Sequence, residues 1–174
     1  MQYVWDVFVR ASHWLLVGAF AVAYWTHDSI WDRDIHAQAG YVAGALLLAR
    51  IFWGFKAKGY ANFSAFPFRP LQGLRYVWQI FTGKSKRFIG HNPAGSLVIY
   101  LILLDGLLSI GSGMWVYNDG WVPSFSLHLA EIHHDFSWAW VVLVLAHVSG
   151  VVFESLVHKE NLVRAMITGY KKEE

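Results

Sequence analysis

IHHDFSWAWVVLVLAHVSGVVFESL, residues 132–156, is a long apolar segment that carries two histidines fourteen residues apart, His133 and His147. At about 1.5 Å rise and 100° turn per residue, a helix places these imidazoles about 21 Å apart along its axis and only ~40° apart around it. Both side chains therefore face one side of the same helix. His134 is thirteen residues from His147 and lies roughly 140° away around the helix, so the helical face favours His133 over His134.

The composition is typical of a membrane protein. Of the 174 residues, 56% are hydrophobic and only 15% are charged, against roughly 25% charged in ordinary soluble domains. The chain has no cysteine, which excludes disulfides, thiolate-held iron–sulfur clusters and the covalent attachment of c-type haem. We therefore expect one domain over residues 1–174 that contacts membrane lipid, binds no nucleic acid and holds any haem by histidine alone.

Four apolar stretches are each long enough to cross a hydrocarbon core of ~30 Å, which takes about 20 helical residues. They lie near residues 8–26, 36–55, 94–116 and 132–156. The predicted fold is an all-α bundle of four transmembrane helices. Pro70 opens a short amphipathic helix that ends near Gly83, and residues 161–170 suggest another helix before the C-terminus.

The distribution of charge predicts the orientation in the membrane. Residues 56–93, between the second and third stretches, carry seven Lys or Arg and no Asp or Glu, so the positive-inside rule places them in the cytoplasm. The other two connections, around residues 28–34 and 118–131, are acidic, with Arg33 as their only Lys or Arg. We expect both connections in the periplasm, both termini in the cytoplasm, and the chain in the bacterial inner membrane.

This orientation pairs four histidines by depth. His13 lies toward the cytoplasm on the first helix and matches His147, whereas His36 opens the second helix at the periplasmic side and matches His133. Two axial imidazoles leave a haem iron six-coordinate, with no open position for oxygen or substrate. The sequence therefore predicts two b haems, each held by a pair of histidines, at two levels of the bundle. A lone membrane histidine could equally serve packing or proton relay, but two matched pairs favour ligation.

Other residues fit this hypothesis less specifically. Gly40 and Gly44 would let a flat macrocycle approach the helices, although glycine is also common where transmembrane helices touch. Arg10 and Arg50 could pair with haem propionates or extend to lipid headgroups. A charged Asp105 in the middle of the third helix costs free energy unless its carboxyl group is neutral, is paired with another group or faces a water-filled cavity. The remaining five histidines lie at span ends or in loops, where a solvated role is expected: His27, His91, His128, His134 and His158.

Several motifs in their order resemble bacterial cytochrome b561 and the haem b subunits of nickel–iron hydrogenases. They are WDVFVRASHW (5–14), HAQAG (36–40), ARIFWG (49–54), GHNPAG (90–95), AHVSG (146–150) and HKENLVRAMITG (158–169). The resemblance implies four transmembrane helices around two b haems, with axial ligands at His13, His36, His133 and His147, and a His91 that is not a ligand. The chain departs from the family in its doubled His133-His134, its mid-helix Asp105 and its short length.

These observations predict a carrier of electrons between a quinone pool, ubiquinone or menaquinone, and a periplasmic partner such as a c-type cytochrome. Arg10, Trp14 and His158 are candidates for the quinone site. The family resemblance leaves two alternatives: the haem b subunit of a membrane-bound hydrogenase, and a superoxide:quinone oxidoreductase, which the acidic periplasmic connections disfavour. Two functions other than electron transfer also stay possible at this stage: a small proton or solute transporter, and a structural membrane anchor. Whether the chain is itself an enzyme, and whether it forms a homodimer, is not decided by the sequence.

Overall fold

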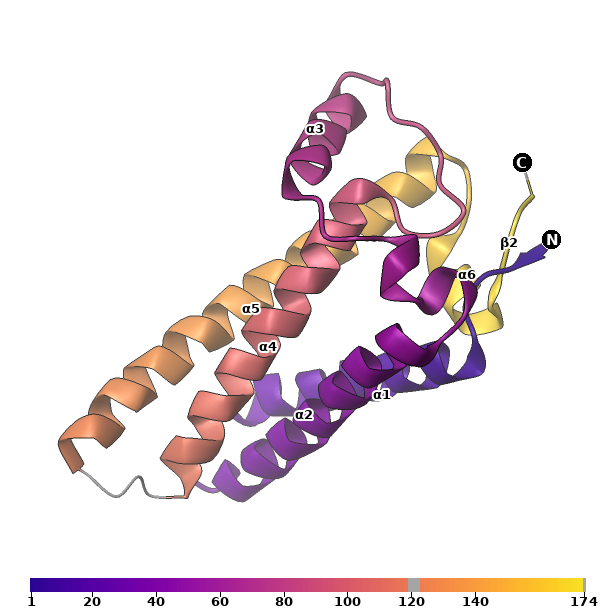
Figure 1. Cartoon of the computed structure of the whole chain (residues 1–174). Helices are drawn as coiled ribbons and strands as arrows, with labels where there is room; N and C mark the ends of the chain where they lie inside the picture. The colour runs from indigo at the N-terminus through magenta and orange to yellow at the C-terminus, as the bar shows by residue number, and fades with distance from the viewer. Residues whose placement is uncertain (119–122, 174) are drawn as a thin grey trace. The chain divides into compact units, whose positions relative to one another are not determined.

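The computed structural model describes residues 1–118 and 123–173, with the side chains of 123–127 excepted. Four long helices follow the four predicted spans (Figure 1): α1 (Val7–Thr26), α2 (Arg33–Lys56), α4 (Pro93–Tyr117) and α5 (Pro123–Val157). Each is long and apolar enough to cross a membrane. The prediction of an all-α fold with four membrane-spanning helices is therefore confirmed. Asp119, which falls in the third connection, lies outside the described residues.

One helix extends beyond its predicted membrane span. The span was expected near residues 132–156, whereas α5 begins at Pro123, so Glu131, which was expected in the third connection, lies in the helix. Proline suits the first turn of a helix, where its missing N–H has no partner to lose. Residues 123–131 are mixed in polarity, since apolar residues alternate there with Ser124, Ser126, His128 and Glu131. Hydropathy therefore detects the membrane-spanning part of this helix and misses the turns that precede it.

The two short helices were predicted correctly. The helix α3 (Pro70–Phe81) starts with its proline and is followed by Gly83 at φ 68°, a conformation that glycine adopts without strain. The helix α6 (Leu162–Thr168) is capped by Asn161, whose side chain accepts a hydrogen bond from the Arg164 N–H, and it ends at Gly169 with φ 88°. Two 3-10 turns, η1 (Gly59–Ala61) and η2 (Phe63–Ala65), lie between α2 and α3.

The chain divides into two compact units that cut across the long helices. The bundle unit comprises Ala11–Ile51 and Leu103–Val142, and the terminal unit comprises Met1–Arg10, Phe52–Ile102 and Leu143–Glu174. In the bundle unit, α2, α4 and α5 pack closely at a small residue. A Cβ on Gly106 would come within 3 Å of both Trp140 and Leu47, and Leu47 is fully buried. Glycine thus allows α2, α4 and α5 to approach closely.

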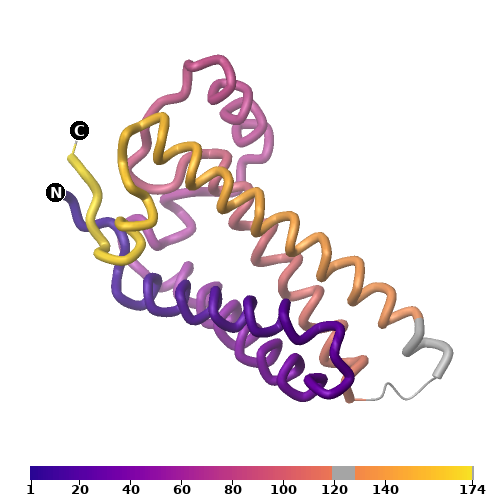
Figure 2. Tube along the Cα trace, turned by 180° about the vertical axis from the view of Figure 1, so that it is seen from behind, coloured from indigo at the N-terminus to yellow at the C-terminus, as the bar shows by residue number. Residues whose placement is uncertain are grey.

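The terminal unit joins the two ends of the chain. Strand β1 (Gln2–Tyr3) pairs antiparallel with β2 (Tyr170–Lys171), so the first and last residues run side by side (Figure 2). Val4 and Trp5 pack beside them on Ala165 of α6. No pattern in the sequence predicted this sheet, because strands of two residues are too short to show a periodicity.

Candidate functional site

His36 on α2 and His133 on α5 face each other in the bundle unit. Their ring centroids are 6.1 Å apart and the ring planes are inclined by 80°. With about 2 Å for a metal–imidazole bond, as in zinc sites, and roughly 1.2 Å from ring nitrogen to ring centre, two imidazoles on one metal ion have centroids about 6.4 Å apart. The observed separation therefore fits a single metal ion held between the two rings.

The hydrogen bonds of both rings select the nitrogen that can bind metal. His36 donates from Nδ1 to the carbonyl oxygen of Ala23 at 2.9 Å, and His133 donates from Nδ1 to the carbonyl oxygen of Ser109 at 2.8 Å. A carbonyl oxygen can only accept, so the hydrogen of each neutral ring is on Nδ1 and the lone pair is on Nε2. Metal-binding histidines are typically oriented in this way.

Each carbonyl is available for a local reason. Ala23 lies in the last turn of α1, where carbonyls have no backbone N–H partner within the helix, and its carbonyl is shared with the Thr26 hydroxyl at 3.4 Å. Ser109 lies inside α4, where the side chain four residues later would normally cover its carbonyl. That residue is Gly113, and a Cβ there would lie 2.7 Å from Cε1 and 2.9 Å from Nδ1 of His133. Gly113 thus makes room for the ring to reach the backbone.

The carbonyls of Ala23 and Ser109 are the parts of this site that were not predicted from the sequence, and for Ser109 a signal exists. The signal is a glycine four residues after the carbonyl that a histidine needs. It becomes visible only once the register between α4 and α5 is known.

The structure separates the two adjacent histidines of α5. His133 lies against His36, whereas the His134 side chain is 68% exposed and its Nε2 accepts a hydrogen bond from the Trp138 indole at 3.0 Å. This is the arrangement expected from the helical-face argument.

The other two predicted ligands belong to different units. His13, in the bundle unit, is half-buried on α1 beside Trp14, with ring centroids 5.2 Å apart. His147, in the terminal unit, is half-buried on α5. The pairing of His13 with His147 therefore stays a prediction.

The two glycines and two arginines that were also predicted to contact the cofactor lie in different surroundings. No atom lies within 4 Å of a Cβ built on Gly40, one turn after His36, so space is open on that face of α2. A Cβ on Gly44 would lie 3.1 Å from Ile110, which marks a contact between helices. Arg10 donates through Nη1 to the Ile167 carbonyl at 2.6 Å, which ties it to α6, and Arg50 is half-buried on α2.

A second polar cluster lies in the terminal unit. The buried Glu154 carboxylate lies 3.2 Å from His158 Nε2 and 3.1 Å from the Tyr76 hydroxyl, with Glu154 on α5 and Tyr76 on α3. Burial and the neighbouring Glu154 raise the pKa of Tyr76 well above its usual value. His158, one of the candidates for quinone contact, therefore lies beside a carboxylate.

Beside it, Glu160 accepts hydrogen bonds from Arg87 and from the backbone N–H of Lys172, and lies 3.7 Å from the ammonium of Lys171. Burial would raise the pKa of Glu160, but these hydrogen bonds and the two positive charges outweigh it and lower the pKa. The carboxylate is therefore held in its charged form.

A metal centre made of protein groups alone is not present in the part of the chain that the structure describes, where no three His, Cys, Asp or Glu side chains gather around one point. An imidazole pair with no other ligand suits a planar macrocycle that supplies the other four metal bonds itself.

Asp105 was the other unusual residue of the predicted spans. Among the described residues, it has a buried carboxylate oxygen, Oδ2, without a hydrogen-bond partner.

Comparison with known proteins agrees with this chemistry. Residues 4–169 match the family described as prokaryotic cytochrome b561. A probable Ni/Fe-hydrogenase B-type cytochrome subunit of Azotobacter vinelandii is 28% identical over 162 residues, covering 80% of this chain and 68% of the relative. A subunit of the same description from Rhodobacter capsulatus and a probable Ni/Fe-hydrogenase 1 B-type cytochrome subunit of Escherichia coli K12 are each 25% identical. They cover 97% and 98% of this chain and 80% and 90% of the relatives. No solved structure matches the chain.

Proposed function

The chain belongs to the prokaryotic cytochrome b561 family, and we propose that it holds two b haems, one between His36 and His133 and the other between His13 and His147. The family match and the four apolar helices together identify a multi-pass membrane protein that transfers electrons through haem b. The number of haems and their ligands are the proposal.

The observation that carries the proposal is the His36–His133 pair. Its separation of 6.1 Å fits one metal ion, and both Nδ1–H groups are bonded to backbone carbonyls, which leaves two Nε2 lone pairs for iron. Bound haem supplies a reversible one-electron couple. His36 and His133 would hold the haem through Nε2, since their Nδ1–H groups are bonded to backbone carbonyls, and the space beside Gly40 is open. Such a site favours electron transfer and disfavours reaction of the iron with small molecules.

We further propose that electrons pass between quinone and a periplasmic redox protein, in the bacterial inner membrane with both termini cytoplasmic. The basic segment 56–93 supports this orientation. The opposite side carries Asp28, Asp32 and Asp34 in or beside the first connection, and this negative charge suits a basic c-type cytochrome.

A hydrogenase is the second candidate partner, because the relatives are described as hydrogenase subunits. The alignment with the Rhodobacter capsulatus relative runs over 213 positions, more than the 174 residues of this chain. That relative therefore has residues within the matched region that this chain lacks. The shorter chain offers less surface for a large partner, which favours the small cytochrome.

The decisive experiment measures haem b per purified chain by the pyridine haemochrome assay. We expect about two haems in the unmodified protein and about one in His36→Ala and in His133→Ala, since loss of either ligand empties the same site. The double variant should match the single ones. Absence of haem after expression with adequate haem supply would refute the proposal and favour the transporter. Electron transfer to a basic cytochrome c, weakening as salt rises, tests the partner separately.

A further inference from the structure

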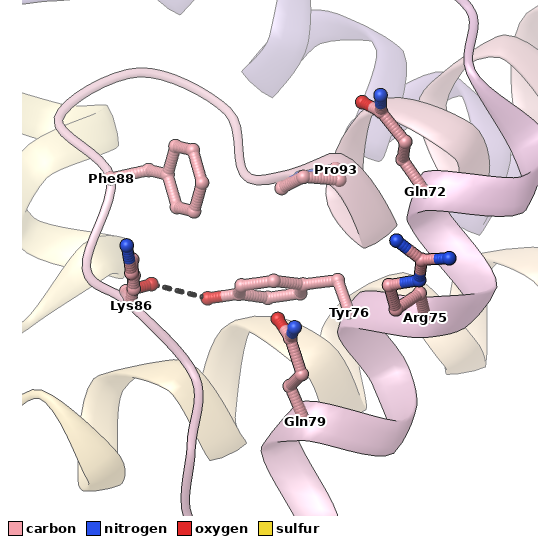
Figure 3. A pocket seen from close by; sticks show the side chains of 7 residues that line it. All are labelled: Gln72, Arg75, Tyr76, Gln79, Lys86, Phe88 and Pro93. Carbon is pink, nitrogen blue, oxygen red and sulfur yellow. Dashed lines mark hydrogen bonds between the residues drawn. The ribbon is translucent and has the colours of Figure 1, made fainter.

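A cavity of about 220 Å³ lies between α3 and the segment that follows it (Figure 3). Two cationic side chains, Arg75 and Lys86, and two amides, Gln72 and Gln79, line it together with the aromatic rings of Tyr76 and Phe88. The cavity therefore combines hydrogen-bond donors and positive charge with apolar walls.

The walls of the cavity are fixed by packing. Tyr76 is only 3% exposed and donates from its hydroxyl to the Lys86 carbonyl at 2.7 Å, which ties the segment to α3 (Figure 3). A Cβ on Gly73 would lie 3.0 Å from both the Pro93 carbonyl oxygen and the side chain of Leu97, so α3 also sits directly on the start of α4. Because burial raises the pKa of Tyr76, the ring stays neutral and adds no negative charge.

The positive charge at the cavity has no internal counterpart. Arg75 and Lys86 take part in none of the ion pairs formed by the described residues, and residues 56–93 contain no Asp or Glu. Glu154 lies behind Tyr76, whose hydroxyl donates to it and whose ring separates it from the cavity, and Glu160 is paired with Arg87 and Lys171. An anion entering the cavity would therefore meet two uncompensated cations.

Next to this polar cavity, α3 presents an apolar stripe. Four large side chains on its outer face are 62% to 80% exposed: Leu71, Leu74, Trp78 and Phe81. Their spacing of three, four and three residues places them on one side of the helix. Apolar side chains exposed in a continuous row are unusual in water and typical of a helix lying in the membrane interface.

We propose that this cavity is the headgroup site of an anionic phospholipid, with the phosphodiester against Arg75 and Lys86 and the acyl chains along the apolar stripe of α3. Basic pockets on the cytoplasmic side of membrane helices are suited to such headgroups. A zwitterionic lipid carries the same phosphate but adds an ammonium group, which the two cations would repel. The bound lipid would fix α3 in the plane of the interface.

The test uses the purified, haem-loaded protein in detergent. It is titrated with phosphatidylglycerol or phosphatidylcholine of the same acyl chains, and the bound lipids are counted by native mass spectrometry. We expect one site with about tenfold preference for phosphatidylglycerol, lost in the double variant Arg75→Gln/Lys86→Gln. The control Lys58→Gln/Lys84→Gln removes the same charge from the same basic segment outside the cavity and should keep the preference.

Haem content, measured in parallel, shows that each variant is folded. Equal binding of the two lipids by the unmodified protein, or equal loss in both double variants, would overturn the proposal. Competition by inorganic phosphate as strong as that by the lipid would also overturn it, since the apolar stripe would then contribute nothing.

Discussion

Replacing Gly113 by alanine tests whether the contact between His133 and the Ser109 carbonyl holds the site. The added Cβ would lie 2.7 Å from Cε1 and 2.9 Å from Nδ1 of His133, whereas carbon atoms in contact prefer about 3.5–4.0 Å. The ring must therefore retreat by roughly 0.8 Å or more. That movement lengthens the 2.8 Å hydrogen bond to Ser109 beyond the usual limit of about 3.2 Å.

The size of the effect follows from these two changes. Loss of the hydrogen bond costs about 0.5–1.5 kcal/mol, and inserting a methyl group into a packed contact costs about 1–3 kcal/mol. Together they weaken haem binding at this pair by about 1.5–4.5 kcal/mol, or roughly 10- to 2000-fold. The gain in helix propensity on replacing glycine, up to about 1 kcal/mol, stabilises the helix and not the ligand.

The matched control is Gly111→Ala, on the same helix, where no atom lies within 4 Å of the new Cβ. It has the same gain in helix propensity and should keep the full haem content. The pyridine haemochrome assay and a redox titration would show that Gly113→Ala loses one of two components and that Gly111→Ala loses none. If both variants bind haem equally and titrate alike, the hydrogen bond of His133 does not determine ligation and the reasoning fails.

Three other variants test separate parts of the structure. His134→Ala should keep the haem content of the unmodified protein in the same assay, since its side chain is exposed; loss of a haem would reverse the choice of ligand. Glu160→Gln should destabilise the fold by about 3 kcal/mol in thermal unfolding, because Arg87 and the buried Lys171 lose their counter-charge. The pKa of Glu160 is lowered on folding, so its stabilisation is complete above the ordinary value of 4.5 and is lost as the pH falls through the lower folded value. The unmodified protein should therefore lose stability from about pH 5 downward, and Glu160→Gln should lack that component; identical pH profiles would contradict this. Tyr76→Phe should cost about 1 kcal/mol and speed backbone hydrogen exchange in residues 82–92, and unchanged exchange would show that the hydroxyl does not hold this segment.

The sequence predicted the helices well where length and hydropathy decide them. The spans 8–26, 36–55 and 94–116 agree with α1, α2 and α4 to within three residues at each end. A membrane-spanning segment must satisfy its backbone hydrogen bonds internally, so an apolar stretch of this length becomes a helix whatever its neighbours do. The start of α5 was not predicted because residues 123–131 are mixed in polarity and form no continuous apolar stretch, so helix formation there depends on Pro123 and on continuity with the span.

The candidate site was predictable only in part. Helical periodicity distinguishes His133 from His134, because the direction of a side chain around a helix follows from residue number alone. The partners of Nδ1 are backbone carbonyls, which every residue has, so no residue type indicates them. Ala23 and Ser109 can be identified only once it is known how α1 packs on α2 and how α4 packs on α5. The sheet between β1 and β2 joins residues at opposite ends of the chain and has no local signal.

The choice of carbonyl partners follows from the membrane. A carboxylate would orient an imidazole equally well, but an acidic side chain inside the hydrocarbon region costs several kcal/mol unless it is compensated. A backbone carbonyl adds no charge, yet helix formation normally occupies it. Two local features make one accessible here, namely the end of a helix, as at Ala23, and a glycine four residues later, as at Gly113. Both occur at the proposed haem site between His36 and His133, so a glycine of this bundle can support a ligand as well as a contact between helices.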